Sequence, residues 1–319
     1  MQTFTWIFLL FLVASTLTQL YLSLRQRHYV AAHRAAVPTA FSDKISLAEH
    51  QKAADYTLAK GQLGRLELGI AFVILLGWTL GGGFNVLDQF WRGFAWSELL
   101  TGTAVIVSLL LISSLLDVPL SLYRTFVLEE KFGFNKMTPK TFWVDLLKGM
   151  GLSLALGLPL VMLILWLMNT AGTLWWLYAW GTLTVFSLFM MWAYPKFIAP
   201  LFNKFSPLEE GEVATRIHAL LERTGFNSKG VFVMDGSRRS GHGNAYFTGF
   251  GKNKRIVFFD TLLKSLTPAQ VEAVLAHELG HFKRKHIVKG MLLSMTMTLV
   301  GFMAIAWFMQ QEWFYTSLG

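Results

Sequence analysis

The stretch "TPAQVEAVLAHELGHFKRKHIVKGMLLSMTMTLVGFMAIAWFM", residues 267–309, places a polar, capped helix directly before an apolar segment. Thr267 is suited to the N-cap, Pro268 to the first helical position, and Gln270 to the third position of a capping box. The apolar part, Ile287–Met309, is longer than the roughly 20 residues that a membrane-spanning helix needs. The stretch therefore predicts a helix of a polar domain that leads into a membrane span.

The composition of the whole chain extends this prediction. Of 319 residues, 54% are hydrophobic and 15% are charged, whereas a soluble domain carries about 25% charged residues. Five further spans are predicted, at Phe4–Leu24, Leu66–Leu87, Leu99–Tyr123, Met150–Met168 and Leu174–Pro195. The first is long and is followed by "RQRHYV", which favours an uncleaved anchor over a signal peptide. Gly81–Gly83 in the second span is interpreted as close helix packing, with a water-filled interior as the alternative.

The distribution of Lys and Arg predicts the orientation of these spans. The first and third connections, residues 25–65 and 124–149, hold seven and five, and residues 196–289 hold fifteen. The second and fourth connections together hold one. Because cytoplasmic connections are the basic ones, the N-terminus is predicted to lie outside. The net charge of +9 is then explained by anionic lipid rather than by nucleic acid.

The predicted fold class is an α-helical polytopic membrane protein with a small α+β domain between spans five and six. Residues 1–195 hold spans one to five with their cytoplasmic loops, residues 196–286 the polar domain, and residues 287–319 span six and an outer tail. Within the polar domain we predict an amphipathic helix over residues 203–226. Three short strands follow in "GVFVMDG" (230–236), "HGNAYFTGF" (242–250) and "RIVFFDTLL" (255–263).

The chemistry-bearing motif is H-E-x-x-H, formed by His277, Glu278 and His281. The chain has no Cys, so only His and carboxylates remain as plausible metal ligands. Two His four residues apart project from one face of a helix and suit one zinc ion. Glu278 is then placed to take a proton from water, whose pKa the metal lowers to about 7. The motif has only three fixed positions, and the alternative to a zinc site is chance.

A hydrolytic zinc site needs a third protein ligand. Four side chains are considered for that position: Asp235, Asp260, His242 and His286. His286 is five residues beyond His281 and is expected to point well away from the ligand face, as an interfacial or solvated His. Glu312 is 31 residues beyond His281 across a membrane helix, so about 45 Å separates them and it is excluded.

Longer segments resemble one family, the type I CAAX prenyl endopeptidases, which are integral-membrane gluzincins. The resemblance is carried by "AFSDKISLAEHQKAADYTLAK", "LEEKFGFNKMTPKTF", "YPKFIAPLFNKFSPLEEG", "SRRSGHGNAYFTGFGKNKRIVFFDTLL" and "VLAHELGHFKRKH". It implies seven spans in a full member, a Zn²⁺ cofactor, and endoproteolysis near the C-terminus of isoprenylated peptides. It also implies that His277 and His281 bind zinc, that Glu278 is the catalytic base and acid, and that Asn244 and Ala245 lie on the substrate-binding strand.

The sequence departs from the family after His281. The family's third ligand is a Glu in an E-x-x-x-D motif after a seventh span, and no such motif follows here. We therefore expect a truncated chain whose third ligand lies beyond Gly319, with weak zinc binding and low activity as it stands.

The predicted function is a zinc-dependent membrane endopeptidase that cleaves prenylated or other membrane-associated proteins. The compact loops favour a bacterial inner membrane, and a monomer is expected. The alternative is a catalytically inactive relative or a non-enzymatic quality-control partner in the membrane. Metal analysis separates the two, because an inactive relative would lack zinc. A transporter is disfavoured, because the spans lack paired charges or matching helix breaks.

Overall fold

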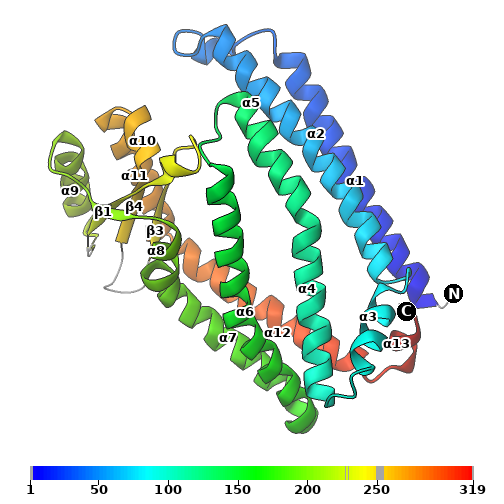
Figure 1. Cartoon of the computed structure of the whole chain (residues 1–319). Coiled ribbons are helices and arrows are strands. Elements are labelled where there is room, and N and C mark those ends of the chain that lie inside the picture. Colours follow the sequence, from blue (N-terminus) through cyan, green and yellow to red (C-terminus); the bar gives the residue numbers. More distant parts are fainter. Residues whose placement is uncertain (1–2, 227, 229, 249–254, 318–319) are drawn as a thin grey trace. The chain divides into compact units, whose positions relative to one another are not determined.

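The computed structural model describes residues 3–226, 228, 230–248 and 255–317, and it is predominantly helical (Figure 1). The chain divides into two compact units. One is formed by Met1–Gly133 together with Ala306–Gly319, and the other by Phe134–Ile305.

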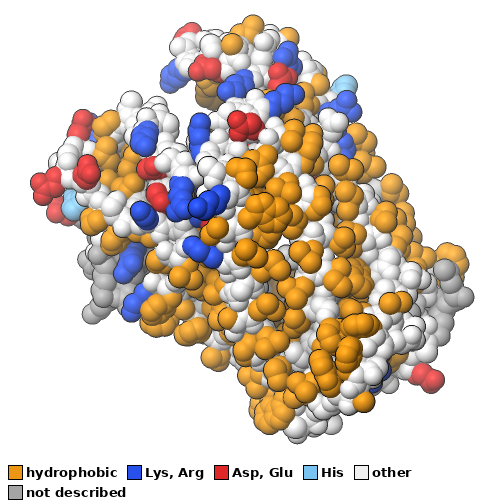
Figure 2. Space-filling model, in the orientation of Figure 1, with side chains coloured by type: hydrophobic (Ala, Val, Ile, Leu, Met, Phe, Trp, Pro, Cys, Tyr) orange, Lys and Arg blue, Asp and Glu red, His pale blue; other side chains and the backbone are white. Residues whose placement is uncertain are grey.

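Apolar helices dominate both units. Among the described residues six helical segments are long and apolar enough to cross a membrane: Thr3–His33, Leu47–Trp78, Glu98–Phe132, Pro139–Thr170, Gly172–Phe202 and His286–Phe308. They correspond one to one with the predicted spans. Large apolar side chains face outward on them, and Trp6, Leu10 and Phe11 are 60%, 67% and 70% exposed. Figure 2 shows many hydrophobic side chains on the helical part of the face in view, as helices that contact lipid require.

The regular elements of the first unit are all helices where the structure describes it. Its elements are α1 (Thr3–His33), a 3-10 turn (Thr39–Phe41), α2 (Leu47–Trp78), α3 (Gly83–Arg92), α4 (Glu98–Tyr123), a π-helical turn (Arg124–Glu129), α5 (Glu130–Phe132) and α13 (Glu312–Ser317). The long helices α1 and α2 lie side by side (Figure 1). Near their connection the Arg34 guanidinium donates to both Asp55 carboxylate oxygens, at 2.6 and 2.8 Å.

The second predicted span is wrong at its C-terminal end. Helix α2 stops at Trp78 instead of continuing to Leu87, and a separate short helix α3 begins at Gly83. Gly82 has φ +76°, and a Cβ on Gly81 would lie 2.8 Å from the Gly77 carbonyl oxygen. The glycines therefore end the helix and turn the chain, which only residues without a side chain tolerate in this geometry.

The second unit combines membrane-type helices with the small mixed domain. Its elements are α6 (Pro139–Thr170), a 3-10 turn (Gly172–Leu174), α7 (Trp175–Ala193), a π-helical turn (Tyr194–Ile198), α8 (Ala199–Phe202), β1 (Phe205–Pro207), α9 (Glu212–Thr224), β2 (Val231–Met234), a 3-10 turn (Gly236–Arg238), β3 (Ala245–Thr248), β4 (Arg255–Phe259), α10 (Asp260–Ser265), α11 (Pro268–Lys283) and α12 (His286–Phe308). The Trp180 indole N–H on α7 donates to the Met295 carbonyl on α12 at 2.9 Å.

The strands form one four-stranded sheet in the order β1–β2–β4–β3. β2 and β4 are parallel, and β1 and β3 pair antiparallel at the two edges. The three predicted strands are confirmed, although residues 249–250 of the second lie outside the described residues. The prediction missed β1, and it was wrong to extend the last strand past Phe259, because Asp260–Ser265 is helical.

The core of the mixed domain lies between the sheet and two helices, α9 and α11. Its buried residues are Ile217, Leu220, Phe226, Val231, Ala245, Ile256, Phe258, Leu262, Val271, Leu275 and Leu279. The predicted amphipathic pattern of residues 203–226 is confirmed only over α9, because the segment before it contains β1. Arg216 and Arg223 on α9 both bind Glu272 on α11, at 3.3 and 2.6 Å, and hold the two helices together outside the core.

Candidate functional site

Helix α11 carries the H-E-x-x-H motif, and its N-terminus is closed as predicted. The Thr267 N–H donates to Gln270 Oε1 at 2.9 Å, and the Gln270 N–H donates to Thr267 Oγ1 at 3.4 Å. Among the described side chains of α11, Val271, Leu275 and Leu279 are buried, and they repeat every four residues and form one stripe. At 100° per residue, His277 and His281 lie on the opposite side of the helix and Glu278 lies beside the stripe.

The side chains behave as this rotation requires. His277 and His281 are exposed, whereas Glu278 is half-buried. The Nε2 atoms of the two histidines lie 3.1 Å apart. Two nitrogens bound to one tetrahedral zinc at about 2.0–2.1 Å would lie roughly 3.3 Å apart. The donor atoms therefore converge as a single zinc ion needs.

The two Asp residues considered for the third position are engaged elsewhere. The Asp235 carboxylate accepts the Lys204 N–H at 2.7 Å. The Asp260 carboxylate accepts the Ser237 N–H at 2.8 Å and also the Ser237 hydroxyl. Burial raises the pKa of the Asp260 carboxyl, but these hydrogen bonds, the Lys264 ammonium and the Thr261 N–H together outweigh burial and hold that pKa below its usual value. Within the described part of the chain, no third His, Asp or Glu completes a metal-binding group.

Of the two remaining His candidates, one lies apart from the motif and the other contacts it. His242 stacks on the Phe134 ring, with centroids 4.2 Å apart, and does not join the motif. His286 does contact the motif, and the expectation that it points well away is wrong. Its Nδ1 lies 2.8 Å from Nδ1 of His281.

The backbone explains this contact. In an uninterrupted helix five residues turn about 500°, so His286 would lie some 140° from His281. The helix is interrupted instead: α11 ends at Lys283, Lys285 has φ +55°, and α12 begins at His286. The left-handed conformation costs a non-glycine residue about 1–2 kcal/mol. This conformation of Lys285 changes the local direction of the chain, so the His286 side chain lies against the imidazole of His281.

The predicted substrate strand lies at an edge of the sheet beside α11. β3 pairs with β4 on one side, and no strand within the described residues pairs with its other side. The Asn244 carbonyl accepts the Phe259 N–H at 2.9 Å, and opposed residues of an antiparallel pair alternate between bonded and non-bonded. Ala245 and Phe247 therefore direct their N–H and C=O groups to the free edge. The Asn244 side-chain oxygen accepts the Ala245 N–H at 2.8 Å.

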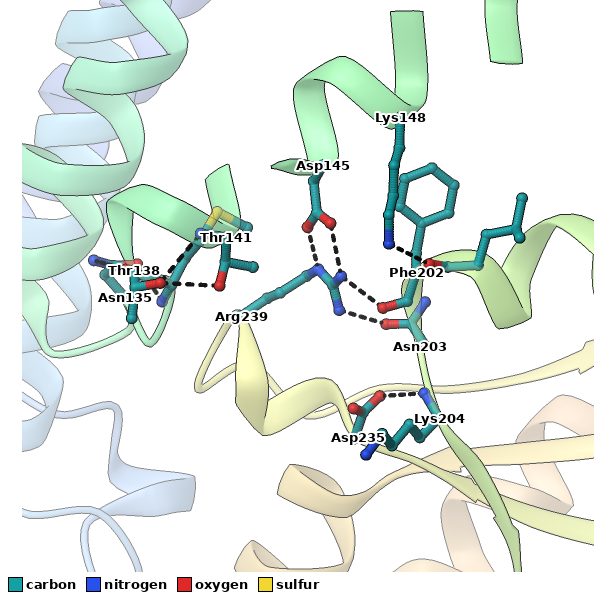
Figure 3. A network of polar contacts seen from close by, with 12 residues as sticks. Asn135, Thr138, Thr141, Asp145, Lys148, Phe202, Asn203, Lys204, Asp235 and Arg239 are labelled. Carbon is teal, nitrogen blue, oxygen red and sulfur yellow. Dashed lines mark hydrogen bonds and ion pairs between the residues drawn. The ribbon is translucent and has the colours of Figure 1, made fainter. Parts of the chain in front are cut away.

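An ion-pair cluster that the sequence did not reveal anchors the loop leading into this strand (Figure 3). The Arg239 guanidinium donates to both oxygens of Asp145 on α6, at 2.7 and 3.1 Å. It also donates to Asn203 Oδ1 at 2.9 Å and to the Phe202 carbonyl at 2.6 Å. The Arg239 and Asp145 side chains are only 19% and 18% exposed. One side chain thus joins a membrane-type helix, the end of α8 and the loop before β3.

Replacing Arg239 with Met is expected to destabilise the second unit strongly. The change leaves the carboxylate of Asp145 largely buried without its cation, which costs about 3 kcal/mol. A unit of this size should then melt roughly 10 °C lower, as measured by thermal unfolding in detergent. Arg238→Met is the matched control, because the neighbouring Arg238 is exposed. Equal melting temperatures for the two variants would contradict the anchoring role.

Comparison with known families divides the chain at the start of the mixed domain. Residues 26–204 match the family model described as "CAAX prenyl protease N-terminal, five membrane helices". Residues 207–319 match "Peptidase family M48". The chain is 37% identical over 291 residues to the CAAX prenyl protease 1 homolog of Oryza sativa, covering 88% of this chain and 67% of that protein. It is 35% identical over 329 residues to CAAX prenyl protease 1 of Saccharomyces cerevisiae, covering 97% and 70%.

The fold is also that of a solved structure. The crystal structure of S. mikatae Ste24p superposes with a TM-score of 0.92 at 34% sequence identity. The match covers 100% of this chain and 75% of that protein. The predicted fold class, an α-helical polytopic membrane protein with a small α+β domain, is therefore confirmed.

Proposed function

This chain belongs to peptidase family M48, with the membrane-helix N-terminal domain of the CAAX prenyl proteases, and from that membership we propose that it is a zinc endopeptidase. The family is one of metallopeptidases, so the activity class follows from membership. The observation that carries the finer proposal is the convergence of His277 and His281 Nε2 atoms, 3.1 Å apart, on a helix beside a free strand edge.

We assign His277 and His281 as zinc ligands and Glu278 as the catalytic residue. The bound zinc would polarise the scissile carbonyl and lower the pKa of water to about 7. Glu278 accepts a proton from the attacking water as its oxygen bonds to the carbonyl carbon. Glu278 then passes that proton to the nitrogen of the breaking C–N bond, which leaves as an amine. The half-buried position of Glu278, next to His277 in the sequence and three residues before His281 on the same helix, supports this role.

The free edge of β3 is proposed to hold the substrate as an added strand. The N–H and C=O groups of Ala245 and Phe247 would pair with the peptide backbone, which fixes the scissile amide beside α11. The Asn244 side-chain oxygen accepts the Ala245 N–H, and a bound peptide would replace it as the acceptor. Backbone pairing is largely independent of side chains, so this edge suits an extended C-terminal peptide.

The names of the relatives motivate the substrate class. We propose that the chain cleaves near the C-terminus of prenylated or other membrane-associated proteins, in contact with membrane lipid and as a monomer. The Lys and Arg distribution supports a cytoplasmic active-site domain and an outer N-terminus. The bacterial inner membrane stays a prediction from the compact loops, and the relatives compared above come from rice and yeast.

Replacing Ala245 with Pro tests the substrate strand. Proline removes an N–H that faces the free edge and leaves the β4 hydrogen bonds intact. KM for a peptide substrate should rise roughly 10-fold, the value of one hydrogen bond, with zinc content unchanged.

Tyr246→Pro is the matched control, because the Tyr246 N–H faces β4 and its loss should destabilise the sheet itself. An unchanged KM in Ala245→Pro would show that substrate does not pair with this edge. Protein with a normal fold that binds no zinc, even at saturating zinc concentrations, would instead favour the inactive-relative alternative.

A further inference from the structure

We infer that His286 is a positioning residue for the zinc ligand His281, acting through the Nδ1–Nδ1 contact of 2.8 Å. The inference rests on the proposed zinc site and adds a residue outside the H-E-x-x-H motif. It also ties that site to the first residue of a membrane-type helix, because His286 begins α12.

The contact assigns the protons on both rings. A neutral imidazole carries one N–H, and the ring nitrogen that binds metal must be the unprotonated one. If Nε2 of His281 faces zinc, its proton is on Nδ1 and is donated toward His286. Nδ1 of His286 is then the acceptor, and its own proton is on Nε2. His286 thereby selects the ligating tautomer of His281 and holds the ring in its orientation.

The backbone between the two residues is built for this contact. Lys285 adopts a left-handed conformation, with φ +55°, which a lysine rarely adopts. Its carbonyl then accepts the Lys289 N–H at 3.0 Å, so the new helix starts within the same turn. A strained residue between a metal-binding helix and a membrane-type helix indicates that their relative placement matters to the site.

His286 is not placed to be the third ligand itself. The two nitrogens of the His281 ring point to different sides, and Nε2 faces His277 while Nδ1 faces His286. A metal held between His277 and His281 would therefore lie across the His281 ring from His286. The role that remains is that of an acceptor behind the ligand.

Two substitutions separate the acceptor from the rest of the side chain. His286→Asn retains an acceptor oxygen at nearly the position of Nδ1, whereas His286→Leu has a similar size and no acceptor. Zinc affinity is measured by chelator competition on the purified protein in detergent, with thermal unfolding of the zinc-free protein as the check on folding. His286→Leu should bind zinc about 10–100-fold more weakly, and His286→Asn within about 3-fold of the unsubstituted protein. His218→Leu, an exposed His on α9, is the matched control and should be unchanged.

The outcomes are distinguishable. Equal zinc affinity in His286→Leu and the unsubstituted protein would overturn the inference while leaving the proposed zinc site intact. Equal loss in His286→Asn and His286→Leu, with normal folding, would also overturn it, because His286 would then act as a ligand rather than as an acceptor. Absence of zinc from the unsubstituted protein, even at saturating zinc concentrations, would contradict the proposed function itself.

Discussion

Replacing Glu278 with Gln is expected to abolish peptide-bond cleavage while zinc stays bound. Glutamine keeps the size and polarity of the side chain but does not accept the proton of the attacking water. It also has no proton to give to the leaving amine. General acid–base catalysis contributes about 10²–10⁴-fold, and one residue performs both transfers, so the turnover rate should fall at least about 10³-fold. Cleavage is measured with a peptide substrate, and zinc by elemental analysis of the same preparation.

Glu272→Gln is the matched control for this experiment. Glu272 lies on the same helix but faces α9, where it binds Arg216 and Arg223. Its replacement should leave turnover near that of the unsubstituted protein. Unchanged cleavage by the Glu278→Gln variant would contradict the assignment of Glu278 as the catalytic base, whatever the zinc content of the variant.

Replacing His277 with Ala is expected to remove zinc and, with it, activity. Structural zinc sites with four ligands gain about 10–16 kcal/mol, which is roughly 3 kcal/mol for each ligand. Loss of one ligand should therefore weaken zinc binding at least about 100-fold, because each 1.4 kcal/mol is a factor of ten. Chelator competition measures the affinity. His277 is exposed and belongs to no hydrophobic contact of the core, so the melting temperature of the zinc-free protein should barely change.

The control for this variant is His218→Ala on α9, which is equally exposed and distant in sequence from the motif. It should retain the zinc affinity of the unsubstituted protein. Stoichiometric zinc in His277→Ala would contradict the ligand assignment, and it would require the metal to be held by other side chains.

The elements that could be predicted from sequence are those with strong local signals. The spans follow from length and apolar content, and α11 follows from the capping residues Thr267 and Gln270 together with its buried stripe. The ends of the predicted helices and the short edge strand could not be predicted as well. The interpretation of Gly81–Gly83 as close helix packing is wrong, because the three successive glycines end the helix. A sequence pattern does not distinguish a glycine that a helix tolerates from one that a positive φ requires. β1 was missed, because a three-residue strand becomes a strand only by pairing with β2.

The candidate site divides in the same way. That His277 and His281 share a face, with Glu278 beside them, follows from the helical repeat, which is a local property. Three other contacts depend on the folded chain: β3 lies at the edge of the described sheet next to α11, Arg239 reaches Asp145, and His286 contacts His281. These contacts depend on sheet order, on a residue 94 positions away, and on one left-handed backbone angle at Lys285. These contacts are determined by packing between segments, so a periodic pattern within one segment does not predict them.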